Sequence, residues 1–376
     1  MNSDTRKPRT ACATSAIQGQ PAVLVAAVLL ALVCVGCSSS VDSEVMVVDA
    51  EPGAIGAASA HTAAIAFSNE ELSPRVLRRF APLNLVANTA PRALVDLGRK
   101  LYYDPRLSKT GTVSCNSCHP LAKYGTTQTP VSTGINGRKG ARNAPTVYNA
   151  AGHFAQLWDG RSPSVEKQAV MPIENGDEMG MTSAEAVSAI DRIAGYRDEF
   201  ARVFPGIARP ISVERIGVAI GAFEHGLMTP ARWDRYLRGD TSALNAQEKA
   251  GAKQFANLGC IVCHTGPLVG GSMFERLGAR VPWPAGADRG RRGVTGNLAD
   301  DMVFKVPSLR NVAMTAPYFH DGSAKTLTEA VHMMARHQLG VELDDEEVRE
   351  LEAWLGSLTG DIPQDYIKPP VLPPGA

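Results

Sequence analysis

The sequence predicts an all-α protein made of two similar helical domains with long connecting loops. The pattern Cys-x-x-Cys-His occurs twice, at Cys115–His119 and at Cys260–His264. An amphipathic helical pattern and a glycine-containing turn precede each motif. The 376 residues are enough for two domains, and the 35 Gly and 25 Pro indicate many loops.

The helix before the first motif is expected to begin at Pro91, which suits the first helical position. Leu94, Leu97 and Leu101 recur at the spacing that places side chains on one face of a helix. The helix before the second motif is expected over residues 245–255, with Asn245 as its N-cap.

Four further helices are expected, near residues 183–193, 212–227, 327–338 and 344–358. Thr328 and Asp344 lie near plausible starts of the last two. Residues 120–180 and 266–318 show little periodicity and much Gly and Pro. We expect long loops there, covering the functional sites.

The first 37 residues are predicted to be an export signal. Basic residues near the start precede an apolar run over residues 21–35, and Gly36-Cys37-Ser38 follows that run. This ending resembles a bacterial lipoprotein signal, although Cys34 stands where Leu is usual. We therefore expect a periplasmic protein anchored by lipid at Cys37, with cleavage to a soluble periplasmic form as the alternative. Residues 38–69 are rich in Ala, Ser and Gly, and they predict a flexible tether.

The overall charge argues against general nucleic-acid binding. Lys+Arg and Asp+Glu both number 38, so the chain lacks the basic excess that is typical of that class.

Cysteine usage gives the most specific functional signal. Three of the seven cysteines lie in the leader, and the other four are Cys115, Cys118, Cys260 and Cys263. Each pair is followed by a histidine, His119 or His264, which is the attachment signature of c-type haem. Redox dithiols, disulfides or one zinc site are the alternatives. They are disfavoured because zinc does not need the trailing His and a thioredoxin-like motif needs a βαβ context.

Several strings around these motifs resemble the bacterial dihaem cytochrome c peroxidases and their relatives that mature methylamine dehydrogenase. The resemblance extends from about Arg92 to Gly360. The strings that support it are Arg142–Thr146, Trp158–Arg161, Gln168-Ala169, Pro172, Glu178-Met179, Phe304–Asn311 and Thr315–Gly322.

The resemblance implies two haems with different tasks. An N-terminal domain, residues 70–235, would hold the peroxide-reducing haem through His119. A C-terminal domain, residues 236–376, would hold the electron-accepting haem through His264 and Met334. His/Met ligation raises a haem potential, which suits electron entry. His332 and His337 are expected to lie outside the ligand set.

The resemblance also assigns roles around the peroxide haem. Glu178 would be the acid–base group, because cleavage of H2O2 requires a proton to move between its oxygens. Gln168 would orient peroxide or water, and Pro172 would line the pocket. Trp158 would lie between the two haems and assist electron transfer.

One Ca2+ is implied between the domains. Its ligands would be the side-chain oxygen of Asn143, the backbone carbonyls of Thr315 and Pro317, and water. Oxygen donors of this kind suit Ca2+.

One position departs from the family pattern. Many of these peroxidases have a His on the loop before Arg142-Asn143, and it ligates the peroxide haem in the resting enzyme. Ile135 stands there in this chain, and Ile cannot bind iron. We therefore expect a peroxide haem that is open in the oxidised state and needs no reductive activation. The maturation enzymes also have an open haem, but they typically have Tyr where Met334 stands.

The function that the sequence favours is a dihaem peroxidase that reduces hydrogen peroxide with electrons from a small cytochrome c or cupredoxin. An enzyme that oxidises residues of a partner protein is one alternative, and a dihaem electron carrier is another. The resemblance leaves a homodimer open, and the sequence shows no signal for one.

Overall fold

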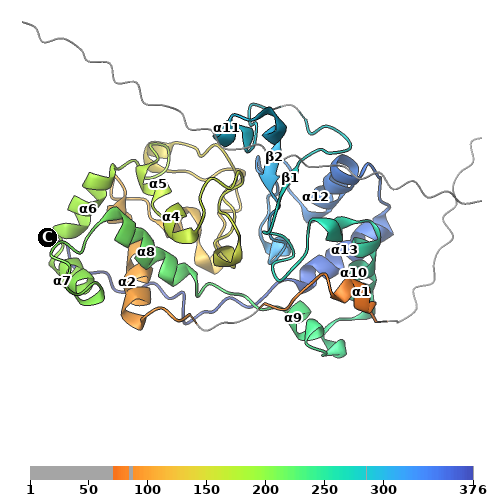
Figure 1. Cartoon of the computed structure of the whole chain (residues 1–376), viewed down its shortest axis with the longest axis horizontal. Coiled ribbons are helices and arrows are strands. Elements are labelled where there is room, and N and C mark those ends of the chain that lie inside the picture. The colour runs from red at the N-terminus through yellow and green to blue at the C-terminus, as the bar shows by residue number, and fades with distance from the viewer. Residues whose placement is uncertain (1–70, 84–87, 285, 376) are drawn as a thin grey trace, which may run out of the picture. The chain divides into compact units, whose positions relative to one another are not determined.

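A computed structural model of the chain describes residues 71–83, 88–284 and 286–375. The predicted leader, the lipidation site at Cys37 and the tether over 38–69 lie outside these residues. The described part is mainly helical (Figure 1), which confirms the predicted fold class. The longer helices are α2 (Arg92–Tyr103), α6 (Ser183–Asp191), α7 (Ala194–Val203), α8 (Val213–Glu224), α10 (Ala246–Asn257), α12 (Leu327–Met334) and α13 (Asp345–Ser357). The shorter ones are α1 (Pro74–Leu77), α3 (Cys115–Cys118), α4 (Val165–Gln168), α5 (Met171–Glu174), α9 (Arg232–Leu237) and α11 (Arg292–Thr295).

Helix starts follow the capping residues closely. Asn245 and Asp344 cap α10 and α13 as predicted, and each side chain accepts a backbone N–H of the first turn. Pro91 is the N-cap of α2 and not its first helical residue. The helix expected from residue 327 begins at Leu327, and Thr326 rather than Thr328 is its cap. Thr326 and Glu329 form a reciprocal capping box that fixes this start.

The first half is built on a close crossing of α2 and α8. A Cβ added at Gly98 would lie 2.5 Å from the carbonyl carbon of Ala219 and 3.1 Å from the Cβ of Phe223. Only glycine therefore permits this approach of the two helices. Four residues later, Tyr102 packs its ring edge against Phe223, with centroids 5.4 Å apart.

The second half repeats this arrangement with α10 and α13 (Figure 1). A Cβ at Gly251 would lie 2.5 Å from the carbonyl carbon of Glu350 and 3.0 Å from the Cβ of Trp354. Four residues later, Phe255 packs on Trp354 with centroids 4.4 Å apart. Each half is thus a helix pair that crosses at a glycine, with an aromatic contact beside the crossing. A haem-attachment motif follows the first helix of each pair.

Each helix pair contributes to a separate hydrophobic core. The N-terminal end of the described chain packs in the core of the second half, and the C-terminal end packs in the core of the first half. Phe80, which follows α1, packs against Trp233 in the core of the second half. Ile367, near the C-terminal end, packs in the core of the first half. The hydroxyl of Tyr366 donates to the Phe223 carbonyl at 2.7 Å. The predicted division of the chain at residue 235 remains a prediction, and each core includes residues from both sides of it.

The two predicted loop regions contain short strands and helices that the sequence did not predict. A two-stranded antiparallel sheet pairs β1 (Phe274–Arg276) with β2 (Val303–Lys305) inside the predicted loop over 266–318. The region 120–180 contains α4 and α5. The helix expected over 327–338 changes after Met334 into a π-helical turn, Ala335–Leu339. None of the helices within the described ranges is both long and apolar enough to cross a membrane.

Candidate functional site

Both Cys-x-x-Cys-His motifs form tight helical turns that present the histidine next to the thiols. Cys115–Cys118 is the short helix α3, and Cys260–Val262 is a 3-10 turn. The N–H of each histidine donates to the carbonyl of the first cysteine of its motif, at 2.8 Å for His119 and 3.0 Å for His264. All four thiols are free, so none is used in a disulfide.

The two imidazoles are oriented in the same way. Nδ1 of His119 lies 3.2 Å from the Gly125 carbonyl, and Nδ1 of His264 lies 3.3 Å from the Val269 carbonyl. A proton on Nδ1 satisfies that carbonyl and leaves Nε2 as a lone-pair donor. Burial lowers the pKa of both, that of His264 to about 4, so both are neutral at pH 7. Free thiols beside a neutral, oriented imidazole fit covalent haem attachment with iron bound through Nε2.

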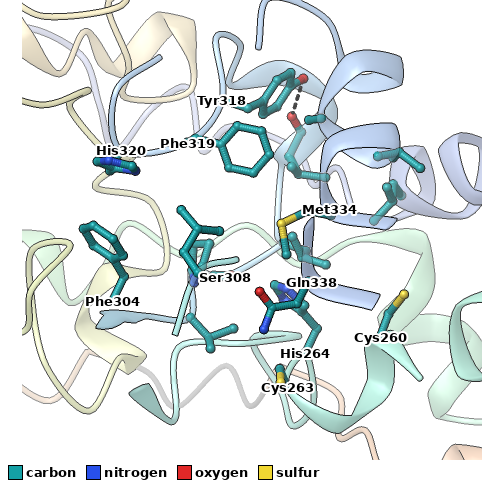
Figure 2. A pocket seen from close by; sticks show the side chains of 18 of the residues that line it. Cys260, Cys263, His264, Phe304, Ser308, Tyr318, Phe319, His320, Met334 and Gln338 are labelled. Atoms are coloured by element: carbon teal, nitrogen blue, oxygen red, sulfur yellow. Dashed lines mark hydrogen bonds between the residues drawn. The ribbon is translucent and has the colours of Figure 1, made fainter. Parts of the chain in front are cut away.

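A cavity of about 270 Å³ lies at the second motif (Figure 2). Cys260, Cys263 and His264 line it together with Met334. Much of the remaining wall is apolar and comes from α10, α12 and α13; it includes Phe255, Leu327, Val331, Leu351 and Leu355. Two thiols, two possible iron donors and an apolar wall fit a flat, largely apolar ring such as haem.

Met334 is the last residue of α12 and faces this cavity. The predicted ligand and His264 therefore meet in one cavity, although they are far apart in the sequence. His337 is directed elsewhere, since its Nδ1 lies 3.0 Å from the Val281 carbonyl. His332 is not part of the cavity wall. Gln338 is part of it, and its side-chain oxygen accepts the N–H of Gly278 at 3.2 Å.

Glu178 lies close to the first motif. Burial raises the pKa of both Cys115 and Cys118, and the negative charge of Glu178 adds to that increase. Oε1 of Glu178 accepts a hydrogen bond from Asn175 Nδ2 at 2.8 Å. Burial raises the pKa of the Glu178 carboxyl above its ordinary value. A half-buried carboxyl with a raised pKa suits proton transfer near neutral pH.

Ile135 packs against the segment that contains Glu178. Its backbone N–H donates to the Glu178 carbonyl at 2.9 Å, and its side chain is 6% exposed in the first core. Gly134 allows this approach, because a Cβ there would clash with the backbone of Asp177 and Glu178. The loop position that the family often uses for a histidine ligand thus supplies an apolar contact in this chain.

The other two predicted pocket residues occupy neighbouring helices. Gln168 ends α4, which packs on α8. Pro172 lies in the first turn of α5, and its carbonyl accepts the N–H of Met179 at 3.1 Å. Both are half-buried. Their predicted roles toward peroxide stay predictions.

Trp158 connects the two halves. Its indole Nε1 donates to the Asn143 carbonyl at 2.8 Å, and its own carbonyl accepts the N–H of Lys305 on β2 at 2.7 Å. The ring also lines the cavity at the second motif. The adjacent Asp159 is ion-paired with Arg142 and Arg161 at 2.6 and 2.7 Å. These contacts fix the backbone and ring of Trp158, and its predicted role between two haems stays a prediction.

The predicted calcium donors border one cavity, and their role toward Ca2+ stays a prediction. Asn143, Thr315 and Pro317 all line the same cavity. Asn143 Nδ2 donates to the carbonyls of Thr129 and Pro130 at 3.1 and 3.3 Å, so that the amide oxygen points away from them. Within the described ranges no group of three or more His, Cys, Asp or Glu side chains forms a metal cluster. An amide oxygen with two carbonyls is a donor set that fits Ca2+.

Sequence reasoning assigned no role to three polar residues of the cavity wall. Lys305 and His320 belong to strings that were recognised, but nothing in the strings indicates burial. His153 lies outside those strings. The meeting of all three at one cavity arises from the packing of distant segments.

Comparisons with known proteins agree with this geometry. Residues 92–242 match the family described as Di-haem cytochrome c peroxidase. The chain is 44% identical to the Cytochrome c551 peroxidase of Nitrosomonas europaea, over 75% of this chain and 84% of that protein. It is 42% identical to the Cytochrome c551 peroxidase of Pseudomonas aeruginosa, over 74% of this chain and 81% of that protein. Among solved structures, a MauG-like protein associated with microbial copper homeostasis matches with a TM-score of 0.68 and 31% identity, covering 77% of this chain and 96% of that one.

Proposed function

Because the chain belongs to the di-haem cytochrome c peroxidase family, we propose that it is an exported enzyme that reduces hydrogen peroxide with electrons from a small redox protein. It is a peroxidase with two c-type haems, and its relatives imply hydrogen peroxide as the substrate. The observation that supports the assignment best is the pair of oriented, neutral histidines beside free thiols. A methionine ligand, Met334, is assigned to the site of His264, and none is assigned to the site of His119.

Each site would hold one haem with its own residues. His119 with Cys115 and Cys118 would hold the peroxide haem, and His264 with Cys260, Cys263 and Met334 would hold the electron-entry haem. When bound, haem iron supplies the electron transfer that breaks the O–O bond. Each H2O2 takes up two electrons and two protons and yields two waters.

The chain supplies proton transfer and positioning. Glu178 would take a proton from the oxygen that binds and return it to the oxygen that leaves. Asn175 holds the Glu178 carboxyl in place through its amide N–H. Gln168 would orient the substrate, and Pro172 would exclude water beside it. Trp158, tied to Asn143 and Lys305, would assist electron transfer between the two sites.

The proposal also covers the cellular location of the protein, a bound Ca2+ and the electron donor. The leader supports export to the periplasm, with lipid attached at Cys37. Asn143, Thr315 and Pro317 would hold one Ca2+ where the two halves meet. A small cytochrome c or cupredoxin would donate electrons to the second site, where Val262, inside the motif, is exposed.

Glu178→Gln tests the assignment. The holoprotein should contain two covalently bound haems and turn over H2O2 with a reduced small cytochrome without pre-reduction. Glu178→Gln should lower kcat by about 10²–10⁴-fold, because the amide cannot exchange a proton. Asp191→Asn, at an exposed carboxylate on α6, should leave turnover unchanged. Fewer than two haems, or equal turnover in Glu178→Gln, would disprove the proposal.

The similarity to a MauG-like structure favours one second candidate, oxidation of residues in a partner protein. Met334 in the cavity argues against it, since the maturation enzymes typically have Tyr at that position. Incubating the holoenzyme with peroxide and candidate proteins, without a small donor, distinguishes the two. Oxidation of protein residues at a rate above donor turnover would favour the second candidate.

A further inference from the structure

Lys305 is a buried lysine at the end of β2, in the wall of the cavity at the second motif. Only 5% of the residue is exposed. Its backbone is fixed by the hydrogen bond from its N–H to the Trp158 carbonyl and by pairing with Phe274 of β1. The side chain therefore belongs to a rigid part of the fold, and solvent does not surround its ammonium group.

The ammonium group lacks an acidic partner in the described part of the chain. Its Nζ lies 3.4 Å from Nδ1 of His153, which is a neutral neighbour. The nearby acid Asp159, next to Trp158 in the chain, is paired with Arg142 and Arg161. Arg142 is also paired with Asp288. The two arginines thus form the ion pairs of these carboxylates, and the ammonium charge of Lys305 has no ion-pair partner among the described residues.

A buried ammonium without a counter-charge is unfavourable, and it persists where a ligand supplies that charge. Burial lowers the pKa of Lys305 to about 8, so the group is still mainly charged at pH 7. Two further buried nitrogens on the same cavity wall have no hydrogen-bond partner among the described residues. They are Nε2 of His153 and Nδ1 of His320. This wall is therefore built to receive an anionic, hydrogen-bonding group.

The cavity has an apolar wall and a polar wall. α10, α12 and α13 supply apolar side chains, whereas β2 and the loops beside it supply Lys305, His153 and His320. Figure 2 shows Phe304, which precedes Lys305, together with His320 on the opposite side of the cavity from Cys260. Haem has the same polarity, since it is an apolar ring with two carboxylates at one edge. The thioether bonds would hold its vinyl edge at the cysteines, away from those carboxylates.

We propose that Lys305 binds a propionate carboxylate of the haem attached at Cys260 and Cys263, with His153 as its hydrogen-bonding neighbour. This inference rests on the proposed function, because it requires a haem at the second motif. It makes Lys305 a positioning residue that also tunes the electron-entry site. A positive charge beside the ring favours the reduced state, which has one more electron.

The test is a redox titration of the purified holoprotein, followed by its visible spectrum. The His/Met haem is identified as the transition of higher potential. Lys305→Gln should lower the reduction equilibrium constant of that haem at least tenfold, which is about 59 mV for a one-electron couple. Lys305→Arg, which keeps the charge, should restore most of the shift. Lys325→Gln, at an exposed lysine, should change nothing.

A crystal structure of the wild-type holoprotein gives a second measurement that needs no variant. Nζ of Lys305 should lie within hydrogen-bond distance of a propionate oxygen. The inference fails if Nζ is directed elsewhere, or if Lys305→Gln leaves the potential unchanged or shifts it no more than Lys325→Gln. Haem content and peroxide turnover of the wild type separate the two proposals. If the wild type has two bound haems and normal turnover but Lys305→Gln leaves the haem potential unchanged, only the role of Lys305 is refuted and the proposed function stands.

Discussion

Gly251→Ala tests the helix crossing on which the second site is built. The new Cβ would lie 2.5 Å from the Glu350 carbonyl carbon and 3.0 Å from the Trp354 Cβ. The Glu350 carbonyl oxygen would lie closer still, so α10 and α13 would have to separate by at least about 1 Å to restore a normal contact of roughly 3.5 Å. Backbone atoms cannot rotate away as a side chain can, so the strain must spread along the crossing.

The magnitude follows from what the crossing buries. Trp354 is fully buried against Phe255, and a gap of about 1 Å forfeits up to half of the dispersion energy of each atom pair. Overpacking typically costs about 1–3 kcal/mol, and we expect about 3 kcal/mol here. In a domain of this size about 1 kcal/mol lowers Tm by roughly 2–4 °C, so the loss should be roughly 6–12 °C.

The assay is thermal unfolding of the holoprotein, followed by the absorbance of the second haem. Gly356→Ala is the matched control, because it lies in α13 and a Cβ there meets no atom within 4 Å. That variant should keep or raise Tm, since Ala is the better helix former by up to about 1 kcal/mol. If Gly251→Ala melts at the temperature of the wild type, the two helices do not cross as closely as described.

Two further predictions concern the first half. Ile135→His should place a possible iron ligand on the loop beside Glu178, so the oxidised enzyme should lose turnover until it is pre-reduced; Ile135→Leu is the control. Equal turnover of Ile135→His with and without pre-reduction would contradict the role assigned to this position. Glu224 is buried on α8, and burial raises its pKa from 4.5 to about 8. Between pH 4.5 and about pH 8 the folded state keeps a proton that the unfolded state has lost. The free energy of unfolding therefore falls by roughly 1 kcal/mol for each pH unit over that range, and the stabilisation is complete only below pH 4.5. Glu224→Gln removes this dependence, and urea unfolding at pH 5.5 and 7.5 should show a smaller stability difference than in the wild type; equal differences would refute the prediction.

Local signals predicted the local structure well. Asn245 and Asp344 cap helices because a short polar side chain can accept the free N–H groups of the first turn. Of the two threonines near the start of α12, Thr326 is the cap, because only Thr326 has a glutamate three residues later for a reciprocal cap. The pairing of β1 with β2 had no local signal, since each strand is three residues long.

The residues of the candidate sites also fall into those that local sequence predicts and those that it does not. The two attachment motifs are contiguous, so their chemistry could be predicted from residue types and spacing alone. Met334, Glu178 and Trp158 had a predicted role only through resemblance to a family. The structure places Met334 in the same cavity wall as His264, and it fixes Trp158 by hydrogen bonds to Asn143 and Lys305. Burial raises the pKa of the Glu178 carboxyl.

By itself the sequence determined the two covalent attachment points, their histidines and the helices before them, because these depend on neighbouring residues. Only the tertiary structure decided how closely each helix pair crosses and which charges lose contact with water. Gly98 and Gly251 are ordinary helical glycines until a second helix packs on them, and Lys305 is an ordinary lysine until β2 buries it. Steric fit and desolvation depend on segments that are distant in the chain, and no local pattern encodes them.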